Sequence, residues 1–173
     1  IFFTSGGTEG DNWAVKAESL KRKHGHIIVS SIEHHAVTES ALWLKNYGID
    51  VTFAPVDEQG IVKLEQLEKM IRNDTFLVSV MLANNEIGTI QPIENVCEIA
   101  HEYGAKVHSD AVAAFGHIDV DVKKLGVDFL NVSGHKICGP KGVGFLYVRG
   151  GKPERFMHGG GQENGLRAGT ENV

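Results

Sequence analysis

Lys136 is the residue in this sequence with the most obvious chemical potential. It follows Ser133, Gly134 and His135 in the stretch SGHKICGPKG, at the junction of two apolar runs that are predicted strands. A lysine amine can form a Schiff base with an aldehyde once burial and neighbouring charges lower the cost of its neutral form. Most lysines are surface residues, so Lys136 taken alone is better explained as an exposed side chain beside a turn.

Two further groups follow other predicted strands and change that balance. Asp110 ends the run KVHSD, where a carboxylate is costly unless it faces a cation, such as a protonated pyridine nitrogen, or caps a helix. His34 and His35 follow the run HIIVSS, where an imidazole can lie over an aromatic ring, move protons or simply be solvated. A metal site of His34, His35, His108 and Asp110 matches no ligand template, so we predict none.

The glycine-rich stretch SGGTEGDN, residues 5–12, leads from a predicted strand into a helix. Backbone N–H groups at such a helix start, with hydroxyls such as that of Thr8, bind phosphate well. The stretch lacks the GxGxxG dinucleotide pattern, and Thr8 could equally be an ordinary cap. The amides in ANNEIG, residues 83–88, could orient a ring hydroxyl or a carboxylate, or cap a turn.

Composition limits the class of protein. The chain has 173 residues, 42% of them hydrophobic, which is enough for the core of one domain. A net charge of −5 without a basic stripe argues against nucleic acid or an anionic membrane as partner. The longest apolar stretch, residues 75–83, is far shorter than the roughly 20 residues of a membrane span. Two distant cysteines, Cys97 and Cys138, fit a reducing, cytoplasmic setting, and we interpret Cys138 as a packing residue.

Apolar, β-branched runs alternate with segments of helical periodicity along most of the chain. This alternation predicts an α/β fold with three αβα layers and a mainly parallel sheet. The predicted strands are 1–4, 26–31, 51–56, 76–82, 105–110, 129–133 and 144–148. The predicted helix 92–103 has Pro92 in its first turn and an apolar stripe of Ile93, Val96, Ala100 and Tyr103; a second stripe is Trp13, Ala17 and Leu20. Five polar loops after these strands should meet at one edge of the sheet.

Taken together, five motifs resemble one family. The stretches FTSGGTEGDN, EHHAV, NNEIGTIQPI, SGHKICGPKGVGFLYVR and HGGGQENGLRAGTENV are similar, in order and interval, to those of the NifS/IscS-like cysteine desulfurases. These belong to the class V aminotransferase superfamily of fold-type I enzymes, which use pyridoxal 5′-phosphate (PLP). The resemblance implies that residues 1–173 are the PLP-binding large domain, truncated at both ends, with the small C-terminal domain absent.

The resemblance also implies a role for each site residue. Lys136 would carry the internal aldimine and later move protons, His34 would stack on the ring, and Asp110 would pair with the ring nitrogen. Asn85 would lie near the ring and the substrate carboxylate. The implied phosphate ligands are Gly7, Thr8, Ser133, Gly134 and His135. Thr170 would reach the partner's phosphate, which implies a homodimer.

The function implied is conversion of L-cysteine to L-alanine, with sulfur passed to an enzyme persulfide and on to a sulfur acceptor or iron–sulfur scaffold protein. Selenocysteine lyase, another class V aminotransferase, or a non-catalytic PLP-binding or docking domain are the alternatives. Ala113 stands where the family usually has a glutamine that bonds the cofactor. The family's persulfide cysteine lies beyond GTEN, so this chain is expected to be inactive by itself.

Overall fold

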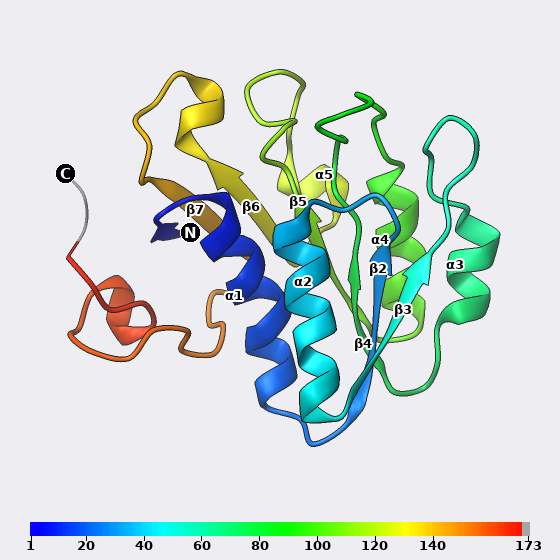
Figure 1. The fold of residues 1–173 in the computed structure, drawn as a ribbon, viewed down its shortest axis with the longest axis horizontal. Helices are drawn as coiled ribbons and strands as arrows, with labels where there is room; N and C mark the ends of the chain where they lie inside the picture. The colour runs from blue at the N-terminus through cyan, green and yellow to red at the C-terminus, as the bar shows by residue number, and fades with distance from the viewer. Residues whose placement is uncertain (171–173) are drawn as a thin grey trace.

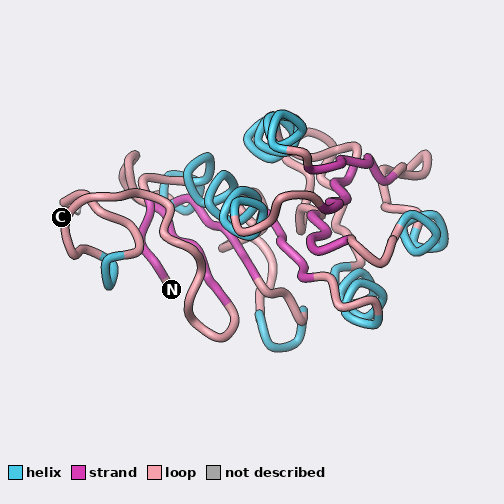
Figure 2. The backbone as a smooth tube through the Cα atoms, turned by 90° about the horizontal axis from the view of Figure 1, so that it is seen from below, coloured by secondary structure: helices cyan, strands magenta, loops and turns pink. Residues whose placement is uncertain are grey.

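The computed structural model describes residues 1–170. A seven-stranded sheet lies between two layers of helices (Figures 1 and 2). The strands are β1 (Phe2–Thr4), β2 (Gly25–Ser30), β3 (Ile49–Ala54), β4 (Thr75–Ser79), β5 (Lys106–Asp110), β6 (Phe129–Ser133) and β7 (Gly144–Val148). The helices are α1 (Gly7–Leu20), α2 (His35–Leu44), α3 (Leu64–Met70), α4 (Ile93–Glu102) and α5 (Val122–Leu125), with 3₁₀ turns η1 (Lys45–Tyr47), η2 (Gly134–Ile137) and η3 (Glu163–Gly165).

Strand direction places the ends of six strands at one edge of the sheet. The strand order is β1-β7-β6-β5-β4-β2-β3, and only β7 runs antiparallel to its neighbours. Because β7 opposes both β1 and β6, β1 runs in the same direction as β2 to β6. The predicted α/β fold with a mainly parallel sheet is therefore confirmed, and the loops after these strands meet at the carboxyl edge.

The sheet is covered on both faces. Helices α1 and α2 pack on one face around Trp13, Ile27 and Leu44, whereas α3, α4 and α5 pack on the other around Leu67, Ile93 and Leu130. Every residue of β2, β4 and β6 is buried, as expected for strands inside a doubly covered sheet.

The helix ends differ from the sequence prediction. Tyr103 and Leu20 belong to the predicted apolar stripes, but unlike the other members they are 46% and 55% exposed. Tyr103 is the C-cap of α4 and Leu20 the last residue of α1, so both lie at the end of a helix. Pro92 is the N-cap of α4 with ψ of 65°, and therefore stands just before the first turn.

Strand β4 is shorter than predicted, but the chain beyond it stays attached to the sheet. The N–H groups of Val80 and Leu82 donate to the carbonyls of His108 and Asp110 at 3.1 and 2.8 Å. This pairing carries the chain along β5 to the carboxyl edge, where residues 83–88 form the next loop. Within residues 1–170, none of the helices is both long and apolar enough to cross a membrane.

Candidate active site

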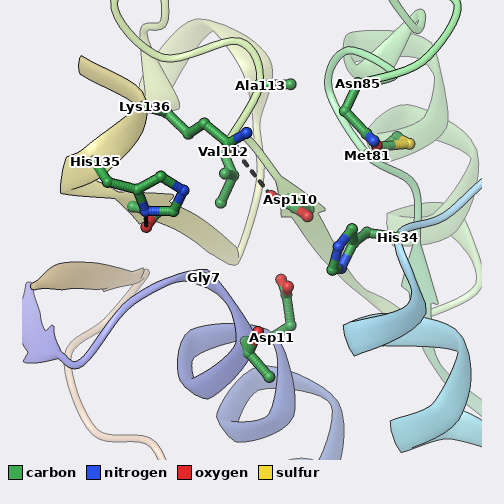
Figure 3. Close-up of a pocket in the computed structure, with 12 residues that line it drawn as sticks. Gly7, Asp11, His34, Met81, Asn85, Asp110, Val112, Ala113, His135 and Lys136 are labelled. Atoms are coloured by element: carbon green, nitrogen blue, oxygen red, sulfur yellow. Dashed lines mark hydrogen bonds between the residues drawn. The ribbon is translucent and has the colours of Figure 1, made fainter. Parts of the chain in front are cut away.

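A cavity of about 230 Å³ lies at the carboxyl edge of the sheet (Figure 3). Eight of the site residues predicted from the sequence line it, and they come from five separate loops. These are Gly7, Thr8, His34, Asn85, Asp110, Ser133, His135 and Lys136. The convergence of loops expected for a parallel sheet is therefore observed.

Two of the predicted residues lie elsewhere. Gly134 does not line the cavity; its N–H donates to the carbonyl of Val143 at 2.9 Å and thereby fixes the turn that carries Lys136. Thr170 is exposed in the C-terminal segment and does not line the cavity either. Its contact with a partner subunit's phosphate stays a prediction.

Lys136 extends over the cavity from η2 (Figure 3). The turn is closed by the N–H of Gly139, which donates to the carbonyl of Gly134 at 2.9 Å, and it ends at Cys138 with φ of 63°. Among residues 1–170 the Lys136 amine has neither a hydrogen bond nor an ion pair, so it is available to a ligand. Cys138 is exposed, so its interpretation as a packing residue was wrong.

The start of α1 forms one end of the cavity. The N-cap is Gly6, whose φ of 145° suits glycine and brings no capping side chain, so the first-turn N–H groups keep their capacity for an anion. Thr8 and Ser133 place hydroxyls beside it, and the Ser133 Oγ lies 2.8 Å from the His135 Nδ1. A Cβ on Gly7 would lie 2.9 Å from Val112, so the close approach here requires glycine.

His34 has a structural role that the sequence did not indicate. It is the N-cap of α2, and its Nδ1 accepts from the N–H of Ala36 at 3.1 Å. This bond orients the ring and assigns the proton of neutral His34 to Nε2. The ring lies beside the cavity opposite Asp110 (Figure 3), so a capping histidine can also contact a ligand.

Asp110 forms the opposite, buried end. It is 4% exposed, and its Oδ1 accepts from the N–H of Val112 at 2.8 Å. Burial, followed by repulsion from Asp11, raises the pKa of Asp110 to about 7. Within residues 1–170 Asp110 forms no ion pair, and a buried carboxyl in this state favours a ligand that presents a cationic N–H.

Sequence reasoning missed Asp11, Met81 and Val112, which also line the cavity. Asp11 is the chemically important one, because its carboxyl points toward Asp110 (Figure 3) and is 1% exposed. The available signal was spacing: Asp11 precedes Ala14 and Val15 by three and four residues, which places it on the sheet-facing side of α1.

Asn84 and Asn85 follow β4, and the sequence left open whether they cap a turn or contact a ligand. Asn84 is structural, since its Oδ1 accepts from the N–H groups of Glu86 and Ile87 and its Nδ2 donates to the carbonyl of Ile32. Asn85 is exposed and lines the cavity. In the described part of the chain, no group of three or more His, Cys, Asp or Glu is arranged to hold a metal ion.

Comparison with known proteins identifies the class. The family model "Aminotransferase class-V" matches residues 1–173, and the chain belongs to that family. "Cysteine desulfurase IscS" of Methanosarcina thermophila is 56% identical over the whole chain, which spans 44% of that relative.

Two solved structures are similar in both fold and sequence. A "NifS-like protein" matches with a TM-score of 0.93 and 50% identity, covering 99% of this chain and 48% of that one. "SspA in complex with cysteine" matches with a TM-score of 0.93 and 43% identity, covering 98% and 50%. The chain therefore spans about half the length of the proteins that it resembles.

Proposed function

We propose that this chain is the cofactor-binding core of a PLP-dependent cysteine desulfurase. The observation that carries the proposal is that a free amine, Lys136, and a buried carboxyl, Asp110, line one cavity whose third side is a helix start. An aldehyde, a basic ring nitrogen and a phosphate are the three groups that PLP presents. Membership of the class V aminotransferase family supports the same cofactor.

The residues fit that cofactor at each end. The first-turn N–H groups of α1, with Thr8, Ser133 and His135, would bind its phosphate. Asp110 would accept a hydrogen bond from the ring nitrogen and hold the proton there. When bound, PLP stabilises negative charge that develops on the substrate carbon attached to the amino group.

Proton movements would fall to Lys136 and His34. The Lys136 amine has no competing partner within the described chain, so it can attach to the aldehyde and later take the Cα proton of a substrate. His34 keeps its Nε2 free because Nδ1 is occupied by the N–H of Ala36. It would lie against the ring and assist proton transfer, while Asn85 would contact the substrate carboxylate.

L-cysteine is the proposed substrate and L-alanine the proposed product. The support comes from relatives named cysteine desulfurase and from the neighbour solved in complex with cysteine. Neither Cys97 nor Cys138 lines the cavity, and burial raises the pKa of Cys97 to about 12. We therefore propose that the sulfur-accepting cysteine, together with the small domain, lies outside this sequence. Residues 1–173 alone would then not convert L-cysteine to L-alanine.

The assembly is also a proposal. Thr170 would bind the phosphate of a second subunit in a homodimer, and the persulfide sulfur would pass to an acceptor or iron–sulfur scaffold protein in the cytoplasm. Thr170 is exposed and therefore accessible to such a subunit.

Covalent capture tests the proposal. PLP is added to the chain, the attachment is reduced with borohydride, and the modified peptide is located by mass spectrometry. We expect modification at Lys136 and its loss in Lys136→Ala. Lys141→Ala, which removes an exposed lysine from the same loop, should leave the modification unchanged. Modification spread equally over both lysines, or unchanged in Lys136→Ala, would contradict the assignment.

A further inference from the structure

Asp11 is anchored beneath the cavity by groups from three strands. Its Oδ1 accepts from Asn131 Nδ2 of β6 at 3.0 Å and lies 3.4 Å from His108 Nε2 of β5. His108 Nδ1 in turn lies 2.8 Å from the Oγ of Ser79 in β4. All four residues are buried, and His108 Nε2 has no well-formed hydrogen bond within residues 1–170.

Within residues 1–170, Asp11 forms no ion pair with a lysine or arginine that would compensate a carboxylate. The titratable groups around the cavity and its floor are His108 and Asp110 on β5, Glu33 and His34 after β2, and His135 and Lys136 in η2. Burial lowers the pKa of His108 to about 4, so this nearest imidazole is neutral. Burial raises the pKa of Asp11 to about 8, against the opposing hydrogen bond from Asn131.

Glu33 adds to the acidic surroundings. Its Oε1 accepts from the Ser30 hydroxyl and from the N–H of Met81, both at 2.6 Å, and its Oε2 is buried without a hydrogen bond among the described residues. Three buried carboxyls, Asp11, Asp110 and Glu33, thus lie close enough to repel one another. A single cation entering beside them would favour the ionised form of each.

We propose that Asp11 is a positioning residue of the cofactor site, which holds a proton when no cation is bound and releases it when a ring with a protonated nitrogen binds beside Asp110. In the release, the Asp11 O–H bond breaks, both electrons stay on the carboxylate, and the proton passes to solvent. Nothing is oxidised or reduced. A second negative charge then helps Asp110 to keep the ring nitrogen protonated. This inference rests on the proposed function.

Proton counting separates this role from a purely structural one. PLP is added to the chain in weak buffer at about pH 7.5, protons released per bound cofactor are counted with an indicator dye, and binding is counted from covalent capture at Lys136. We expect the wild-type chain to release up to about one proton more than Asp11→Asn. At about pH 10, where Asp11 is already ionised, the two counts should become equal.

A control variant and two contradicting outcomes distinguish the role of Asp11 from the proposed function. Glu102→Gln, which changes an exposed carboxyl at the end of α4, should match the wild type at both pH values. Equal counts in wild type and Asp11→Asn, with normal capture at Lys136, would overturn the role of Asp11 and leave the proposed function standing. Absence of capture in the wild type would overturn the proposed function itself.

A measurement on the wild type alone covers the case in which Asp11→Asn does not fold. Infrared difference spectra with and without PLP should show loss of a protonated-carboxyl C=O band at about pH 7.5. A spectrum in which no protonated carboxyl is lost contradicts the proposal.

Discussion

The two ends of the cavity are built on opposite principles. At the end formed by α1 and η2, the groups are exposed and act as donors or cations: backbone N–H groups, Thr8 and Lys136. Where α1 packs against the sheet, the groups are buried carboxyls, Asp110 of β5 and Asp11 of α1, and within residues 1–170 neither forms an ion pair with a lysine or arginine. A ligand that fits both ends must be anionic at one and cationic at the other.

The difference in burial decides how strongly each end acts. Exposed hydrogen bonds and charges exchange with water and contribute little net energy, whereas a buried charge interacts strongly because water cannot screen it. The exposed end should therefore contribute orientation, and the buried end should control the protonation of the ligand.

Among the substitutions at the two ends of the cavity, Asp110→Asn should have the largest effect on PLP affinity. The substitution keeps the shape but removes the negative charge, so the ring nitrogen loses its partner. We expect PLP affinity, measured by equilibrium dialysis, to fall by roughly 10- to 100-fold, in line with about 1.5–3 kcal/mol for a charged hydrogen bond. Asp119→Asn, on an exposed loop, should bind as the wild type does. Unchanged affinity in Asp110→Asn would remove the distinction between the two ends.

Gly10→Ala should separate the two ends physically. Gly10 lies where α1 meets β6, and an added Cβ would collide with the Asn131 side chain. The start of α1 would have to move away from β6. We therefore expect a loss of about 1–3 kcal/mol in the free energy of unfolding. Urea unfolding measures this loss. Gly104→Ala tests the backbone cost alone, because its φ of 76° is strained for alanine while nothing lies within 4 Å of an added Cβ.

The three buried carboxyls should make the free energy of unfolding depend on pH. The pKa values of Asp11, Asp110 and Glu33 are raised to about 8, 7 and 8, so the stability that they contribute is complete below about pH 4 and is lost as pH rises to about 8. His108 acts oppositely: its pKa is lowered to about 4, so its contribution is lost as pH falls from about 6.5 to 4.

Thermal unfolding of wild type and Asp11→Asn checks this pH dependence. Between about pH 6.5 and 8, where His108 stays neutral, the midpoint of the wild type should fall by more than that of Asp11→Asn, corresponding to at least about 1 kcal/mol. Parallel curves for the two proteins would mean that Asp11 ionises as readily in the fold as in the unfolded chain.

The smallest effect is expected from the loss of a single neutral hydroxyl near the start of α1. Ser133→Ala removes one hydroxyl and its contact with His135, while the N–H groups of α1 remain. PLP affinity should fall by only about 2- to 10-fold, the equivalent of one ordinary hydrogen bond. A loss as large as that in Asp110→Asn would show that a neutral hydroxyl contributes as much to binding as the buried carboxyl does, contrary to the comparison above.

Some features of the cavity could be predicted from the sequence, whereas others could not. The residues that end strands, such as Asp110 and Ser133, could be predicted because a parallel sheet brings those ends together. The spacing of Asp11 to Ala14 and Val15 indicates that it faces the sheet, but its contacts with Asn131 of β6 and His108 of β5 depend on packing between distant segments. Cys138 was interpreted as a packing residue, and Tyr103 and Leu20 were placed in apolar stripes from their spacing, but a turn and two helix ends leave all three exposed.

A crystal structure of the chain with PLP bound would show whether Lys136 and Asp110 contact opposite sides of one ring. We expect continuous electron density from the Lys136 Nζ to the cofactor, with the ring nitrogen within about 3 Å of the Asp110 carboxylate and the phosphate at the start of α1. A ring bound through Lys136 but turned so that its nitrogen faces solvent, or a cofactor bound outside the cavity, would contradict the account.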